Sequence, residues 1–336
     1  MRHRGPHAYS ATIFSGDVPM APGRHALHLS TQMQEMARRI GALATSDGFL
    51  PSALPEVRLM RSGRHLSRRP MIYAPSVVII AQGRKLARFA DRTFAYDPGH
   101  CLTLNVPLPF ESETFGTPSE PVLGMVVRIT PALVTELLLQ LDAPPPESAL
   151  QAMQACPMDD ALADAALRLL ACMRRPEEAR ILRPALIREL TYRLLDSAHG
   201  SNLRALGHTG SRFGQIAKIL NRLHTDYAQD HDIERMARDA GMSLSSFHAH
   251  FKHITASSPL QYLKTIRLHR ARMFMVNERM SASQAAARVG YESVSQFGRE
   301  FKRLFGDTPG NITAQLRAIL SERGIAQLHG TPEFFD

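Results

Sequence analysis

The sequence has no tryptophan, only three cysteines and no apolar run that approaches the ~18 residues of a membrane-spanning helix. Its cysteines, Cys101, Cys156 and Cys172, lack the paired spacing of a disulfide framework or a zinc site. Residues 1–25 contain no apolar stretch of the kind that forms a signal peptide. We therefore expect a protein of a reducing cytoplasm without a membrane segment.

Recognisable catalytic motifs are also missing. The chain has no Gly-x-Ser-x-Gly elbow, no phosphate-binding P-loop and no dinucleotide-binding glycine motif in its usual context. A metal-dependent β-barrel enzyme would need several histidines at ligand spacing, whereas His100 stands alone after a Pro-Gly turn. His248, His250 and His253 form a local cluster, but their place on a predicted helix favours surface or phosphate-facing roles over metal binding. We expect no metal, no cofactor and no enzymatic activity.

The positive charge of the chain is unevenly distributed. The net charge is +9, and residues 211–317 contain 16 Lys and Arg against 9 Asp and Glu. An excess of positive charge in one module favours a polyanionic partner, of which nucleic acid is the commonest. With 336 residues, the chain is long enough for this module to be one of two domains.

The first two thirds of the chain predict a β-rich domain with flanking helices. Between about 57 and 129, short β-branched and apolar runs alternate with turn signals, which favours an antiparallel barrel or sandwich. The clearest strands are 76–80, 102–106 and 122–129, and helices are expected at 28–45, from Pro131 to Leu141, and at 159–173 and 178–198. The apolar stripes of 159–198 would serve equally well to pair two copies in a dimer or to pack on the barrel.

The predicted organisation has four parts. They are a disordered extension (1–25), a sensor or dimerisation domain (26–199) that includes the helical segment 159–198, a Gly- and Ser-containing linker (200–210), and an all-helical domain (211–322). The overall fold class is therefore α+β, with the β-rich part first.

An internal repeat with a period of about 50 residues dominates the C-terminal part. Ala237, Gly241, Ser243, Phe247, Phe251, Lys252 and Pro259 of the first copy recur as Ala286, Gly290, Ser293, Phe297, Phe301, Lys302 and Pro309. A short amphipathic helix, a glycine-led turn and a second amphipathic helix occur in each copy. This pattern is typical of two helix-turn-helix units in tandem, and the favoured function is sequence-specific DNA binding.

Capping signals predict the helix boundaries of this domain. Asp232, Ser243, Ser258, Ser281 and Ser293 are placed as N-caps, and two of the serines begin capping-box patterns. Seven helices follow, at 211–227, 233–240, 244–254, 259–277, 282–289, 294–305 and 309–322. The long fourth helix would hold the two units at a separation suited to successive major grooves.

The second helix of each unit has a predicted inner and outer face. Four phenylalanines at i, i+4 spacing are expected in the core. Base readout is predicted for Ser245, His248, Ala249, Ser295, Gln296 and Arg299, and phosphate contact for Ser246, Lys252, Lys302 and Arg303. Arg299 and Gln296 are the strongest candidates, because arginine binds guanine and glutamine binds adenine through two hydrogen bonds each. The small Ala249 suggests that the first unit reads less sequence.

Residues 211–317 resemble the DNA-binding domain of the AraC/XylS family of bacterial transcription regulators, on the strength of these repeated residues and of the stretch 287–302. The N-terminal part is similar to the cupin-like sensor domain of one AraC subgroup at 73–75, 78–85 and 96–99. The resemblance implies a cytoplasmic bacterial regulator of the activator kind, although no residue distinguishes activation from repression.

By the same resemblance, the cupin-like domain would bind an unidentified small-molecule effector or form a homodimer. The expected partners are double-stranded promoter DNA and RNA polymerase. The opposing hypothesis is a ligand-binding or catalytic barrel whose helical domain mediates protein contacts. Cys101, at the start of a predicted strand, is expected to be a buried structural thiol rather than an oxidant sensor.

Overall fold

The computed structural model describes residues 24–141, 151–197, 200–207 and 210–322. Residues 1–23, which form nearly all of the predicted disordered extension, lie outside this range, as does the proline-rich break at 143–147. Helix α1 begins at Arg24 and ends at Leu43.

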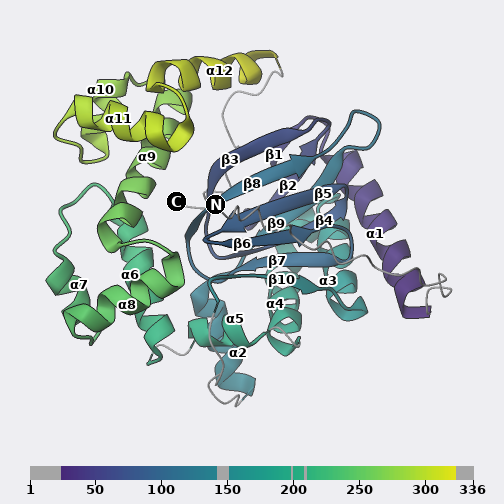
Figure 1. Cartoon of the computed structure of the whole chain (residues 1–336). Helices are drawn as coiled ribbons and strands as arrows, with labels where there is room; N and C mark the ends of the chain where they lie inside the picture. Colours follow the sequence, from purple (N-terminus) through teal and green to yellow (C-terminus); the bar gives the residue numbers. More distant parts are fainter. Residues whose placement is uncertain (1–23, 142–150, 198–199, 208–209, 323–336) are drawn as a thin grey trace, which may run out of the picture.

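The N-terminal domain is built from two antiparallel sheets (Figure 1). The strand order is β1-β2-β9-β4-β7-β10 in one sheet and β3-β8-β5-β6 in the other. The strands are β1 (Gly48–Pro51), β2 (Val57–Ser62), β3 (Leu66–Tyr73), β4 (Ser76–Gln82), β5 (Arg84–Phe89), β6 (Arg92–Tyr96), β7 (His100–Leu104), β8 (Leu108–Phe115), β9 (Val122–Arg128) and β10 (Met153–Pro157). The prediction of a β-rich domain with antiparallel sheets is confirmed, with the strand expected at 102–106 lying two residues earlier.

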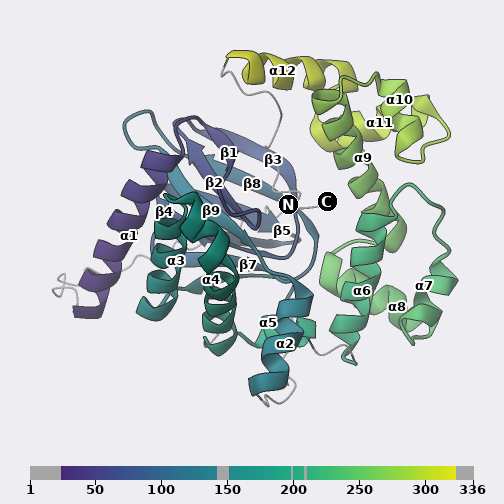
Figure 2. The same ribbon diagram turned by 180° about the vertical axis from the view of Figure 1, so that it is seen from behind.

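The six-stranded sheet is covered on both faces, which explains its continuous apolar runs. Strands β4 and β9 are buried along almost their whole length, because the other sheet covers one face and helices cover the other. Figure 2 shows α1, α3 and α4 on that outer face. The helices of this domain beyond α1 are α2 (Pro131–Leu141), α3 (Asp160–Cys172), α4 (Pro176–Asp196) and α5 (Ser201–Gly207).

Helix α5 corrects the prediction of a linker at 200–210. Gly200 and the polar residues around it predicted an irregular segment, yet Leu203 and Leu206 are buried in the core, and α5 packs against α2 and α6. The burial of these two leucines outweighs the weak helix propensity of their neighbours. The β-rich domain and the helical domain are therefore joined by packed structure over most of this stretch.

The helical domain consists of seven helices within the described residues, as predicted. They are α6 (Arg212–Thr225), α7 (Ile233–Asp239), α8 (Leu244–Thr255), α9 (Pro259–Asn277), α10 (Ala282–Arg288), α11 (Val294–Phe305) and α12 (Pro309–Glu322). Their bounds agree with the predicted ranges to within two residues, because each cap is encoded locally.

A buried hydrogen-bond chain connects the two domains. The hydroxyl of Tyr262, on α9, donates to the carbonyl oxygen of Pro107 at 2.6 Å. Its oxygen lies 2.7 Å from Nε2 of His224, on α6. Because the phenol proton is used on Pro107, Nε2 of His224 carries a proton and acts as the donor. Burial lowers the pKa of His224 well below its usual value, which keeps the ring neutral.

Tyr262→Phe should lower the free energy of unfolding by about 1–3 kcal/mol, because two buried polar groups lose their partner while the ring packing is kept. The measurement is urea unfolding of the full chain. Tyr227→Phe is the matched control, since no hydrogen bond of the Tyr227 hydroxyl is seen among the described residues. An equal loss in both variants would contradict the bridging role of Tyr262.

Candidate nucleic-acid interface

Two helix pairs, α7–α8 and α10–α11, have the same local construction. The second helix of each pair begins at a serine, Ser243 or Ser293, whose side chain accepts a hydrogen bond from the backbone three residues later. At the start of α10, Ser281 and Gln284 form a complete capping box. The serines of the sequence repeat therefore set where each second helix starts.

The glycine-led turns require a left-handed backbone. Gly241 and Gly290 have φ angles of +62° and +82°, and the next residue donates back to the carbonyl of Ala237 or Ala286 in the helix that has just ended. A Cβ on Gly290 would lie 2.6 Å from the carbonyl oxygen of Ala228. This position therefore requires glycine both for its backbone angle and for its close contact.

The four phenylalanines of the repeat form the core of the two units, as predicted. Phe247, Phe251, Phe297 and Phe301 are all fully buried. Within each unit the two rings pack at centroid distances of 5.6 and 5.5 Å. Phe251 also packs edge-on against Tyr262, which connects the first unit to α9. Burial of one face of α8 and α11 in this way leaves the opposite face to solvent.

The ends of α8 and α11 differ at one position. Both helices end in a left-handed residue, which is Ala256 (φ 56°) in the first unit and Gly306 (φ 88°) in the second. Ala256→Gly should raise the free energy of unfolding by about 1 kcal/mol, because an L-residue is disfavoured in this conformation. Gly306→Ala should lower it by a similar amount, since its Cβ would meet open space and only the backbone term changes. Urea unfolding of the full chain measures both, and changes of the same sign in the two variants would contradict this account.

Most of the predicted readout residues lie on the solvent-exposed faces. On α8, Ser245, His248, Ala249 and Lys252 are exposed, and on α11 the same is true of Ser295, Arg299, Lys302 and Arg303. Ser246 is half-buried, and its hydroxyl lies 3.3 Å from Nδ1 of His250. Among the described residues, the three cations of the α11 face form no ion pair. Their charge is therefore available to an anionic partner.

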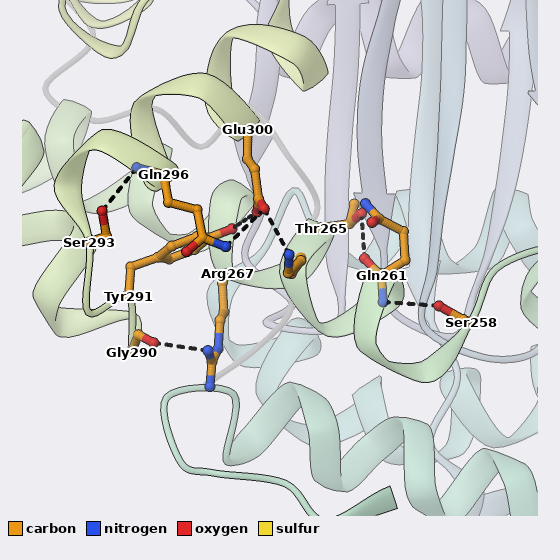
Figure 3. A network of polar contacts seen from close by, with 10 residues as sticks. Ser258, Gln261, Thr265, Arg267, Gly290, Tyr291, Ser293, Gln296 and Glu300 are labelled. Atoms are coloured by element: carbon orange, nitrogen blue, oxygen red, sulfur yellow. Dashed lines mark hydrogen bonds and ion pairs between the residues drawn. The ribbon is translucent and has the colours of Figure 1, made fainter.

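Gln296 differs from the other predicted readout residues because its side chain has an internal partner. Figure 3 shows its amide nitrogen donating to Glu300, at 3.1 Å, beside the Tyr291 hydroxyl at 2.7 Å. Lys264, from α9, forms an ion pair with the same carboxylate at 2.7 Å. Burial raises the pKa of Glu300, but these three hydrogen bonds outweigh it and place the pKa below its ordinary value. The sequence repeat gave no signal for this network, because Lys264 lies outside it.

Arg267, on α9, holds the two units together. Its guanidinium donates to the backbone carbonyls of Tyr227, Gln229 and Gly290 at 2.7–2.9 Å. The first two carbonyls precede α7. The third, that of Gly290, precedes α11 and is drawn with Arg267 in Figure 3. One side chain thus joins the entrance of the first unit to the turn of the second. Sequence analysis did not identify this residue, since its partners are backbone atoms distant in sequence.

The predicted N-terminal candidates show no feature of a reactive site. His100 is exposed and lies 3.0 Å from Asp97. Burial raises the pKa of the Cys101 thiol, and raises that of Cys156, its cross-strand neighbour, to about 12. Both thiols are therefore protonated at neutral pH, which disfavours oxidant sensing. Within the described residues, no group of three or more His, Cys, Asp or Glu side chains is placed to hold a metal ion.

Two helix-turn-helix units with cationic outer faces, joined to a β-rich domain, form an architecture suited to binding DNA. Comparison with protein families agrees. Residues 53–202 match the N-terminus of AraC-type transcriptional regulators, and residues 236–315 match a helix-turn-helix domain. The N-terminal domain is therefore of the AraC type, and the C-terminal part is of the helix-turn-helix type.

The similar characterised proteins are bacterial regulators. The virulence regulon activator VirF of Yersinia enterocolitica is 30% identical over 142 residues, which cover 42% of this chain and 52% of VirF. The activator RhaS of Klebsiella pneumoniae is 29% identical over 106 residues, or 32% of this chain and 38% of RhaS. The chain thus spans about half the length of VirF and 38% of the length of RhaS.

The fold of most of the chain is similar to that of ToxT from Vibrio cholerae. The apo structure of a ToxT variant has a TM-score of 0.54 at 10% identity and covers 78% of this chain and 98% of ToxT. A structure of ToxT with a bound unsaturated fatty acid has a TM-score of 0.51 at 11% identity, covering 80% of this chain and 95% of ToxT. At these identities the similarity concerns the fold. In the described part of the chain, no helix has the length and apolar character to cross a membrane.

Proposed function

We propose that this protein regulates transcription by binding two short blocks of promoter DNA, one with each helix-turn-helix unit. The observation that carries the proposal is the pair of matched units, whose outer faces bear cations that form no ion pair with any residue the structure describes. The helices α8 and α11 would each enter a major groove, and α9 would set their separation. The DNA-binding domain would comprise residues 211–322, and residues 26–199 would form the sensor domain.

The residues proposed to contact DNA fall into two groups. Base readout is assigned to Ser245, His248, Ala249, Ser295, Gln296 and Arg299, and phosphate contact to Ser246, Lys252, Lys302 and Arg303. Adenine readout by Gln296 would require its amide to exchange Glu300 for the base, because such readout uses both the nitrogen and the oxygen. Glu300 would then keep Lys264 and Tyr291 as partners. Arg299 needs no such exchange.

The N-terminal domain is proposed to bind a small-molecule effector. ToxT, which has a similar fold, binds a fatty acid, and this supports a ligand-responsive role. The contact between Tyr262 and Pro107 would connect effector binding to the DNA-binding helices, since it joins α9 directly to the segment before β8.

Homodimer formation is proposed through the outer helices of the same domain. Ile181 and Leu182, on α4, and Leu139, on α2, are exposed large apolar side chains, whereas most of the leucines of α3 and α4 are buried. Helix α3 packs against both α1 and α4. The buried face of these helices packs within the domain, and the exposed apolar side chains on the opposite side are available to a second copy. RNA polymerase is the further proposed partner, as the similar activators imply. The protein would act in the bacterial cytoplasm, without enzymatic activity.

The test is selection of genomic DNA fragments by the purified full-length protein at near-physiological salt. We expect a recurrent motif of two blocks whose centres lie about one helical turn apart. Retention of fragments without any shared motif would reject sequence-specific regulation in favour of general DNA coating.

A further inference from the structure

Lysine is rare in this chain, and one of its lysines is buried inside the β-rich domain. There are five lysines, and Lys85 is the only one before residue 218. Lys85 lies on β5 and is 3% exposed. Its ammonium group lies 3.3 Å from the thioether sulfur of Met60 and 5.5 Å from the centroid of the Phe49 ring. Met60 and Phe49 belong to β2 and β1, in the opposite sheet, so the amine lies between the two sheets.

This environment does not satisfy an ammonium group. An ammonium has three donors, and a thioether is a weak acceptor. No carboxylate of the described residues forms an ion pair with Lys85, and the carboxylates of β8, Glu111 and Glu113, are paired with other cations. Burial lowers the pKa of Lys85 to about 7, and the charge of the nearby Arg69 adds to this effect. A buried amine that is half-protonated near neutral pH and has no anionic partner calls for an explanation.

Two buried tyrosines are neighbours of Lys85 or of the Phe49 ring that it contacts. Neither Tyr73 nor Tyr96 has a hydrogen-bond partner of normal geometry for its hydroxyl in the described part of the chain, and both are fully buried. Tyr96 is the direct cross-strand neighbour of Lys85 on β6. The Tyr73 ring packs edge-on against Phe49, at 6.1 Å, and against Phe110, at 5.0 Å. Phe49 therefore contacts both the amine and Tyr73.

Burial favours the neutral form of these hydroxyls, as it does for the amine. Burial raises the pKa of both tyrosines, so they remain protonated and able to donate. The Ser112 hydroxyl, near Tyr96, opposes part of this effect and is itself buried without a partner of normal geometry. The neighbourhood of Lys85 thus contains an amine, the tyrosine hydroxyls and a serine hydroxyl as donors, together with the rings of Phe49 and Phe110. The nearby charge, that of Arg69, is positive. Such a set is suited to a ligand with one anionic group and an apolar body.

We propose that the interior of the β-rich domain binds a small carboxylate, with the carboxylate on Lys85, Tyr73 and Tyr96 and the apolar body against Phe49 and Phe110. A carboxylate has only acceptors and carries one charge, which matches a single lysine with hydroxyl donors. A phosphate, with nearly two charges, would require a second buried cation. This assignment names the effector class of the proposed regulator and so rests on the proposed function.

The site is connected to the contact between the domains. Tyr73 is the register partner of Leu108 on β8, and the preceding residue, Pro107, accepts the hydrogen bond from Tyr262. A ligand that orders the Tyr73 hydroxyl would therefore act one residue away from the bond that joins α9 to this domain. This short path gives a physical route from effector to DNA-binding helices.

The test uses the full-length protein labelled with ¹³C at the lysine ε-carbon, which gives five signals. The signal missing from Lys85→Met should titrate near neutral pH. Straight-chain carboxylates from acetate to decanoate and the corresponding primary amides are then added. At least one carboxylate should raise the pKa of Lys85 by about one unit or more, because it places a negative charge beside the amine. The amides should leave this pKa unchanged.

Calorimetric titration supplies the second readout. Lys85→Met should weaken binding of that carboxylate about tenfold or more, and Tyr96→Phe should weaken it by a smaller factor, since a charged hydrogen bond exceeds a neutral one. The exposed Lys218→Met is the matched control and should bind normally. Tyr96→Phe also provides a test if Lys85→Met does not fold.

Failure of every carboxylate to move the Lys85 signal, or equal binding to wild type and Lys85→Met, would overturn the proposal. Selection of DNA fragments by the ligand-free protein separates this outcome from failure of the proposed function. If the carboxylates fail while ligand-free wild type and Lys85→Met both recover a two-block motif, only the carboxylate site is rejected and the proposed DNA-binding function stands.

Discussion

Replacing Phe301 by alanine is expected to lower the free energy of unfolding by about 3–5 kcal/mol, because a fully buried ring leaves a cavity that its neighbours fill only in part. The ring is in contact with Phe297, at 5.5 Å, and with Phe305, at 4.5 Å. These three side chains make up much of the small core of the second unit. Loss of one should therefore unfold α10–α11 before the rest of the chain. Urea unfolding and hydrogen exchange of α11 amides would measure the two effects.

The matched control for Phe301→Ala is Val294→Ala on the same helix. Val294 is 50% exposed, so its truncation should change stability by no more than about 0.5 kcal/mol. A loss below about 1 kcal/mol for Phe301→Ala would mean that the second unit does not depend on this aromatic core. The variant should also lose one block of the DNA motif, since only one of the two units is unfolded.

Arg299→Ala should remove discrimination at one base pair, by about 1–3 kcal/mol, while binding to random DNA falls much less. Arg299 is exposed on α11 and is not held by any ion pair in the described part of the chain, so its guanidinium is available to bind guanine through two hydrogen bonds. The measurement is the affinity for the selected site and for all single-base variants of it. Arg299→Lys is the sharper comparison, because lysine keeps the charge but loses the planar pair of donors.

Lys302→Ala serves as the contrasting variant from the same face. As a phosphate contact, it should weaken specific and random DNA alike and reduce the slope of log affinity against log salt by about one. Preserved discrimination in Arg299→Lys, together with uniform weakening in Arg299→Ala, would reassign Arg299 to the phosphate contacts. Lys302 and Arg299 would then be equivalent, and sequence readout would have to come from other residues of the two units.

The helical domain could be predicted closely because its signals are local. A serine cap and its partner lie three residues apart, as in Ser281 and Gln284, and a terminating glycine lies within two residues of the helix it ends. The buried phenylalanines lie four residues apart on one helix. Each of these relations spans a single helical turn, so the chain specifies it whatever the distant packing.

The parts that sequence analysis missed depend on contacts distant in sequence. The side chain of Gln296 shares the carboxylate of Glu300 with Lys264, 36 residues away from that glutamate. Helical periodicity alone places Gln296 on the outer face and cannot reveal that partner. Strand β5 is a second example. In this strand Lys85 is buried and Leu86 is only partly buried. A reading from hydrophobicity alone would place Leu86 inward and Lys85 in solvent, which is the reverse of the structure.

The attachment made by Arg267 has a consequence for the DNA sites themselves. One guanidinium fixes the start of the first unit and the turn of the second, and the 19-residue helix between them is about 28 Å long. One extra base pair between the two blocks would move the second block by about 3.4 Å and rotate it by roughly 35° around the duplex axis. A stiff connection of this kind cannot follow such a rotation. Under the proposed function, the spacing between the blocks is therefore as much a part of the recognised sequence as the bases within them.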